Sequence, residues 1–168
     1  MTTIKLAIGS IFVGFTVFGL KALAYWITGS VALLSDALES TVNVATAFAA
    51  LIAIHIAAKP ADANHPYGHH KVEFFSAVLE GVMIIVAALL IFREAYHGFM
   101  QPVVLDAPVA GLVVNMAATV LNGLWAWVLI TRGRAQKSPA LVADGKHLIS
   151  DVLTSIGVAA GVILAVVT

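Results

Sequence analysis

Five long apolar segments limit what this chain can fold into. They cover most of its length, at residues 4–26, 31–58, 72–92, 109–130 and 141–167. A helix needs about 20 apolar residues to cross the hydrocarbon core of a bilayer, and each segment reaches that length. Helices also satisfy their own backbone hydrogen bonds in lipid. The sequence therefore predicts an all-α, polytopic transmembrane helical bundle, with residues 1–168 forming a single transmembrane domain and no soluble domain.

The composition argues against the common classes of soluble protein. Hydrophobic residues make up 61% of the chain and charged residues 11%, whereas soluble domains are about 45–50% apolar and about 25% charged. The absence of cysteine excludes disulfides, thiol catalysis and thiolate metal sites. A formal net charge of zero without a basic run argues against nucleic acid as a partner.

The basic residues predict how the helices are oriented, because lysine and arginine are enriched in cytoplasmic loops. The connection after the second segment holds Lys59 and Lys71, and residues 131–140 hold two arginines and a lysine. Lys5 precedes the first segment, whereas the opposite side offers mainly Arg93. The N-terminus and both basic connections are therefore expected in the cytoplasm. Compact loops and the absence of cysteine suit a multi-pass protein of a bacterial inner membrane.

Ionisable residues interrupt two of the apolar segments at helical spacing. A carboxylate at the bilayer centre costs about 2.5–3.5 kcal/mol on insertion scales, so such residues indicate a functional site. Two triplets share the offsets i, i+3 and i+7, namely Asp36, Glu39 and Asn43 in the second segment and Asp144, His147 and Asp151 in the fifth. These offsets place each triplet on one face of its helix. If the two faces meet, Glu39, Asn43, His147 and Asp151 converge.

Those converging groups predict a site for a divalent cation. Two carboxylates neutralise the charge of the ion, and imidazole and carboxylate are ligands of four-coordinate Zn²⁺. The amide oxygen of Asn43 also suits Mn²⁺ or Fe²⁺. The alternative is that polar side chains only hold the helices together, which we favour for Asn115 and Asn122. Gly157 and Gly161 form a small-residue pair, which favours close helix packing.

A histidine-rich connection forms a second cluster, made of Asp62, His65 and His69. Pro66, Tyr67 and Gly68 predict a turn that brings the two histidines together. With Asp62 they provide the ligand types of a metal site. A solvated interfacial loop without metal is an equally good interpretation.

Three motifs resemble those of the cation diffusion facilitator family. They are residues 26–34 (WITGSVALL), 64–73 (NHPYGHHKVE) and 143–151 (ADGKHLISD). Their order and spacing match, and the resemblance covers essentially the whole chain. It implies a secondary transporter rather than an enzyme, usually a homodimer, that carries a divalent metal out of the cytoplasm in exchange for protons. The metal is then the substrate, protons are the coupling ion, and no prosthetic group is expected.

The resemblance also implies roles for individual residues. The four positions of the transport site hold Glu39, Asn43, His147 and Asp151. A cytoplasmic loop site found in some members matches Asp62, His65 and His69. Lys71 falls where members carry a basic residue that holds the helices near the dimer interface. Asp36 and Asp144 are expected to support the transport site.

Departures from the family pattern shape these expectations. Glu39 and Asn43 stand where zinc-transporting members place His or Asp followed by Asp. Zn²⁺, the common cargo of the family, stays the first candidate, and this departure adds Mn²⁺, Fe²⁺, Co²⁺ and Cd²⁺ as alternatives. The sequence shows neither the family's C-terminal cytoplasmic domain nor a readable sixth span, so Lys71 has no visible partner from that region. Two other functions stay open, a non-transporting membrane assembly module and a metal-permeable channel with the same fold.

Overall fold

A computed structural model describes residues 2–100 and 108–167 of the chain. Its five helices are α1 (Thr3–Thr28), α2 (Val31–Ala57), α3 (Val72–Met100), α4 (Pro108–Ala135) and α5 (Pro139–Val167). Each helix coincides with one of the apolar segments, which confirms the predicted all-α helical bundle. The third apolar segment ends at residue 92, but α3 continues to Met100. Residues 101–107, in the connection that follows, lie outside the described residues.

Four of the helices have the length and apolar composition needed to cross a membrane. The stretches that meet this criterion are Thr3–Thr28, Ala32–Ala57, Val72–Leu90 and Val109–Ala135. Within its described residues α5 is not among them, and it carries Asp144, Lys146 and Asp151. Asp144 and Asp151 are each only 1% exposed, so these carboxylates face the interior of the bundle.

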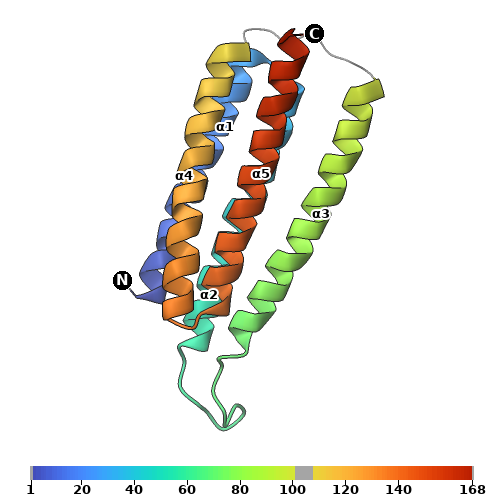
Figure 1. The fold of residues 1–168 in the computed structure, drawn as a ribbon. Helices are drawn as coiled ribbons and strands as arrows, with labels where there is room; N and C mark the ends of the chain where they lie inside the picture. The colour runs from blue at the N-terminus through green and yellow to red at the C-terminus, as the bar shows by residue number, and fades with distance from the viewer. Residues whose placement is uncertain (1, 101–107, 168) are drawn as a thin grey trace.

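Four helices form a closed bundle and α3 packs on its side. α1 contacts α2 and α4, and α5 contacts α2 and α4, while α3 packs on α2 and α5. Figure 1 shows α3 leaning away from the other helices toward its C-terminal end. The N-terminus, the loop between α2 and α3 and the α4–α5 connection share one end of the bundle, here called the loop end (Figure 1). The distribution of lysines and arginines predicts the same grouping of these three elements on one side of the membrane.

A tight turn sets α1 against α2. Gly29 has φ 62°, a left-handed conformation that glycine adopts without strain, and its N–H donates to the carbonyl of Tyr25 at 2.7 Å. The backbone N–H of Ser30 then donates to the Thr28 hydroxyl at 3.2 Å. Because the turn is this short, residues at similar sequence distances on its two sides lie level with each other. Lys21 and Asp36 form such a pair.

Small residues let the helices of the bundle approach closely, and most of the buried apolar residues are alanines. At Gly145 of α5, a Cβ atom would lie 2.7 Å from Ile130 Cγ1 and 3.1 Å from the Ala126 carbonyl oxygen, both on α4. Gly157 and Gly161, where the sequence favours close packing, have nothing within 4 Å of such an atom. That expectation is wrong among the described residues, and Gly145 makes the close contact instead.

The interior of the bundle contains many polar side chains. The buried ionisable and amide residues are Lys21, Asp36, Asn43, Glu80, Asn115, Asn122, Asp144, His147 and Asp151. Polar groups removed from water are unfavourable unless they are paired or serve a ligand. The hydrogen-bonding partners of these residues therefore indicate where a functional site lies.

Candidate metal centre

The two polar stripes predicted from the sequence meet at the interface between α2 and α5. The Ser155 hydroxyl donates to Asp36 Oδ1 at 3.0 Å, and the Thr154 hydroxyl donates to Glu39 Oε2 at 3.3 Å. One carboxylate oxygen from each of Asp36, Glu39 and Asp151 lies within 4.8 Å of the other two. We call these three residues the acidic cluster. Asp36 and Asp151 are buried and Glu39 is half-buried, so the cluster lies inside the bundle.

A lysine of α1 reaches into the acidic cluster. Lys21 Nζ lies 2.7 Å from Asp36 Oδ1 and 3.0 Å from both carboxylate oxygens of Asp151. The side chain is 1% exposed, so the ammonium is separated from water. The sequence analysis missed this residue. The available signal was a lysine inside the first apolar segment, but lysines near a helix end can also extend to the membrane surface.

Asp151 also accepts a hydrogen bond from α4. The Asn122 amide donates to Asp151 Oδ2, so this carboxylate joins α1, α4 and α5. The interpretation of Asn122 as a packing residue is therefore incomplete, because it holds a predicted metal ligand in place. Asn115, two turns earlier on α4, is fully buried, and its amide has no hydrogen-bond partner among the described residues.

The other two residues of the predicted transport site, Asn43 and His147, are buried without hydrogen bonds. Among the described residues, neither polar atom of the Asn43 side chain and neither ring nitrogen of His147 has a partner. The Asn43 side chain is nevertheless a near neighbour of Asp151. His147 precedes Asp151 by one turn of α5, but its ring is not part of the acidic cluster. The structure thus brings Glu39 and Asp151 together and leaves Asn43 and His147, on the same two helices, without a hydrogen-bond partner among the described residues.

Asp144 lies nearer the loop end than Asp151, and outside the acidic cluster. It hydrogen-bonds Ser10 of α1 and interacts electrostatically with Glu80 of α3. Glu80 is fully buried and accepts a hydrogen bond from the Ser76 hydroxyl at 3.4 Å. Together with His147, these carboxylates continue the polar interior from the acidic cluster toward the loop end.

The loop between α2 and α3 holds the second predicted cluster. His65 Nδ1 lies 3.0 Å from Asp62 Oδ1, His69 Nε2 lies 3.5 Å from Asp62 Oδ2, and the two imidazole centroids are 4.3 Å apart. Gly68, at φ 77°, donates its N–H to the His65 carbonyl at 3.0 Å. This is the turn that the sequence predicts, and it brings the two histidines together.

The loop cluster contains an ionised carboxylate. Hydrogen bonds from the His65 ring and backbone hold the pKa of Asp62 below its ordinary value. One ligand atom from each of Asp62, His65 and His69 lies within 4.8 Å of the others, which suits a metal ion bound by carboxylate and imidazole. Lys71 follows this loop, directly before α3, and its side chain is exposed.

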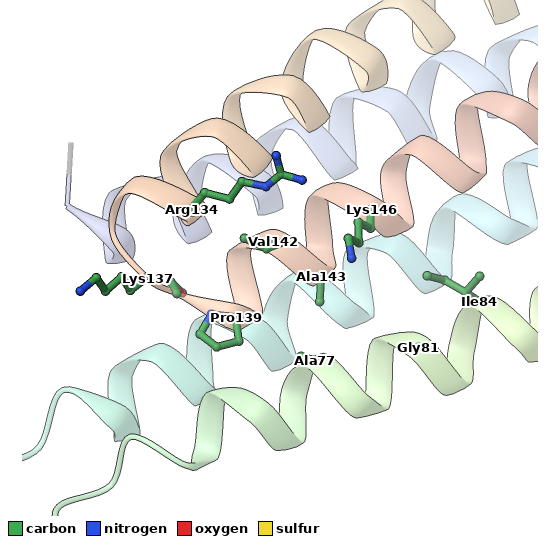
Figure 2. A pocket seen from close by; sticks show the side chains of 11 residues that line it. Ala77, Gly81, Ile84, Arg134, Lys137, Pro139, Val142, Ala143 and Lys146 are labelled. Carbon is green, nitrogen blue, oxygen red and sulfur yellow. The ribbon is translucent and has the colours of Figure 1, made fainter.

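A pocket at the loop end has the wrong charge for a cation. It lies between α3 and the α4–α5 connection (Figure 2). Its volume is about 560 Å³. Arg134, Lys137 and Lys146 contribute to its lining, which contains no acidic residue. Three cationic side chains repel a metal ion. The acidic cluster and the loop cluster are therefore the better candidates in the described part of the chain.

The chain is similar to known transport proteins over most of its length. A family model described as the cation efflux transmembrane domain matches residues 7–168. The chain is 51% identical over 162 residues to an uncharacterized transporter of Synechocystis sp., covering 96% of this chain and 52% of that protein. It is 33% identical over 138 residues to the cation-efflux pump FieF of Cronobacter sakazakii, covering 80% and 45%. It is 31% identical over 151 residues to FieF of Pectobacterium carotovorum, covering 88% and 49%. The chain thus spans about half the length of these relatives.

Proposed function

The chain belongs to the cation efflux family, and we propose that it carries a divalent metal cation out of the cytoplasm in exchange for protons. Relatives that cover 80% or more of the chain are named cation-efflux pumps, which supports metal efflux rather than an enzymatic reaction. We propose Zn²⁺ as the first candidate for the cargo, followed by Mn²⁺, Fe²⁺, Co²⁺ and Cd²⁺. The site would lie between α2 and α5, in a bacterial inner membrane with the N-terminus in the cytoplasm.

One observation carries this proposal: two facing helices hold a cluster of carboxylates and, on the same helices, buried polar groups without hydrogen-bond partners among the described residues. Glu39 and Asp151 belong to the acidic cluster, whereas Asn43 and His147 have no hydrogen-bond partner among the described residues. A buried polar group without a partner costs about 1–3 kcal/mol. A metal ion bound by all four residues would remove that cost and neutralise both carboxylates. Helix packing alone does not explain why the imidazole and the amide are buried unpaired.

Proton exchange follows from the ligand types. A metal binds neutral imidazole and ionised carboxylates, so protons carried by these groups leave when the metal arrives. Imidazole can hold either a proton or a metal ion on the same nitrogen, which makes His147 the candidate for exchanging a proton. Rocking of the helices around a fixed site would expose it to each side in turn, as in other secondary transporters.

The loop cluster is proposed as a second metal site at the cytoplasmic end. Its three ligand atoms are already within 4.8 Å of one another, and the loop lies at the end that the basic residues assign to the cytoplasm. Ligands on an exposed loop suit a site that binds and releases metal quickly. We also propose that the protein acts as a homodimer, with Lys71 near the interface, on the basis of the family resemblance.

Metal flux into proteoliposomes tests the proposal. Zn²⁺ and Mn²⁺ uptake is measured with a pH gradient imposed and then collapsed, for the unchanged chain, Asp151→Ala and the control Lys146→Ala. Lys146 is exposed on the same helix, so its replacement should leave uptake unchanged. We expect saturable, gradient-dependent uptake that Asp151→Ala abolishes, because that change removes a ligand and a charge.

Three other results would contradict the proposal. Metal uptake by the Asp151→Ala variant would refute the proposed site between α2 and α5. Downhill metal flux that does not saturate and does not depend on the pH gradient would identify a metal-permeable channel. No flux of either metal through folded protein would favour a non-transporting assembly module.

A further inference from the structure

We propose that Lys21 is a tethered cation that occupies Asp151 while the transport site is empty and withdraws onto Asp36 when a divalent metal binds. The proposal rests on the proposed function, because it takes Asp151 as a metal ligand. It assigns a competitive role to a residue outside the four predicted ligands. It also explains why the site contains a third carboxylate, that of Asp36.

Lys21 occupies both carboxylate oxygens of Asp151, the atoms that would bind a metal. An ammonium group has three N–H donors, and three carboxylate oxygens lie within 3.0 Å of Lys21 Nζ. Both oxygens of Asp151 are among them, and Asn122 donates to one of these as well. A divalent ion bound to Asp151 would stand next to the ammonium and be repelled by it. Metal binding therefore requires Lys21 to leave Asp151.

Asp36 is placed to receive the displaced ammonium. It already lies 2.7 Å from Lys21 Nζ, nearer than either oxygen of Asp151. Its two carboxylate oxygens also accept the Ser155 hydroxyl, at 3.0 and 3.2 Å. Asp36 thus has donors from α1 and α5 without any metal. The flexible lysine stem allows Nζ to leave Asp151 while it keeps this contact.

The charges of the cluster agree with this division of roles. Ionised, Asp36, Glu39 and Asp151 carry three negative charges, and Lys21 carries one positive charge, which leaves two negative charges. One divalent metal neutralises this remainder. Asp36 then balances Lys21, and Glu39 and Asp151 balance the metal. A second cation in the site is compatible with binding only because the third carboxylate is present.

Metal titration of the full chain in detergent tests the proposal. All variants carry Asp62→Ala, His65→Ala and His69→Ala, so that the loop cluster does not contribute, and Zn²⁺ and Mn²⁺ binding is followed by calorimetry. The key variant is Lys21→Met with Asp36→Asn, which removes one positive and one negative charge together. We expect it to bind metal on the order of tenfold tighter than its parent, because no ammonium has to be displaced.

A second variant tests the receiving carboxylate. Asp36→Asn alone leaves Lys21 with Asp151 as its charged partner, so we expect metal binding to weaken on the order of tenfold. Asp144→Asn removes a negative charge from the same interior without contact to Lys21, and it measures the effect of charge alone. Asp36→Asn should weaken binding more than Asp144→Asn does. Lys5 is an exposed lysine on α1, the helix that carries Lys21. The Lys5→Met substitution should leave the metal affinity unchanged.

Two results would overturn the proposal. One is a double variant that binds metal no tighter than its parent. A double variant that folds but no longer binds metal has the same meaning, because Lys21 would then be needed to form the site and would not compete for it. The other is an Asp36→Asn variant whose metal binding is weakened no more than that of Asp144→Asn. This comparison tests the role of Lys21 even if the double variant does not fold. Failure of the proposed function looks different, because Asp151→Ala would then bind metal as its parent does.

Discussion

At the scale of single residues, Asp151 is the group on which the interior of the bundle depends. It accepts hydrogen bonds from Lys21 and Asn122, and it lies in the same cluster as Glu39 and Asp36. A buried carboxylate with this many charged neighbours is unfavourable unless it is held in place by donors. The donors from α1 and α4 are therefore as much a part of the site as the ligands themselves.

Replacement of Asn122 by leucine should destabilise the protein. It leaves an oxygen of the buried Asp151 carboxylate with one donor fewer, which we expect to cost about 1–3 kcal/mol. Asn115→Leu on the same helix is the matched control, because its amide is buried without a hydrogen bond among the described residues. That change should be neutral or stabilising. Thermal unfolding in detergent measures both, and equal effects of the two substitutions would contradict the role of Asn122.

The sequence predicts which helix faces are polar better than it predicts which side chains meet. The offsets from Asp36 to Asn43 and from Asp144 to Asp151 define two helix faces, and both faces are directed into the bundle. Helical spacing cannot predict Lys21, because the residues that it contacts lie 15 and 130 positions away. The pairing of helices depends on packing between segments. The periodicity within one segment carries no information about that packing.

At the scale of elements, hydropathy predicts the lipid-facing part of a helix rather than the whole helix. The third apolar segment ends at residue 92, but α3 continues through residues 93–100, which are partly polar. A helix that leaves the hydrocarbon region keeps its backbone hydrogen bonds in the interface, so polarity alone does not end it. The loop before α3 was more predictable, since Pro66, Tyr67 and Gly68 are turn-forming residues.

The loop cluster should show a shifted titration. Hydrogen bonds from His65 lower the pKa of Asp62. They therefore stabilise the loop at pH values above the ordinary aspartate pKa of about 3.9. This stabilisation is lost as the pH falls through the lowered pKa of Asp62. His65→Ala should raise the Asp62 pKa toward its ordinary value, and His70→Ala should not. Carbon NMR of the Asp62 carboxyl measures the midpoint. An unchanged midpoint in His65→Ala would contradict the contact.

The packing of α4 against α5 should depend on one glycine. Gly145→Ala places a Cβ atom 2.7 Å from Ile130 and 3.1 Å from the Ala126 carbonyl oxygen, so the helices must separate. We expect a loss of about 1–3 kcal/mol in stability. Gly157→Ala on the same helix meets nothing within 4 Å and should be neutral, or stabilising by up to about 1 kcal/mol. Thermal unfolding compares them, and a harmless Gly145→Ala would show that α4 and α5 pack less closely.

At the scale of the whole molecule, the arrangement separates a polar interior from an apolar exterior. α1, α2, α4 and α5 enclose the acidic cluster, whereas large apolar residues of α3 such as Phe75, Leu89 and Phe92 are exposed. This inversion of the pattern of soluble proteins suits a bundle surrounded by lipid with its charges inside. The buried carboxylates of α5 are covered by the other helices of the bundle.

The coordination of bound metal tests most directly whether the site lies between α2 and α5. In a chain with Asp62→Ala, His65→Ala and His69→Ala, X-ray absorption of bound Zn²⁺ should show oxygen ligands and the outer-shell scattering of one imidazole, that of His147. His147→Ala should remove this imidazole signal, and Asp151→Ala should abolish binding. Zinc bound without an imidazole, or with an imidazole that His147→Ala leaves in place, would contradict the proposed site.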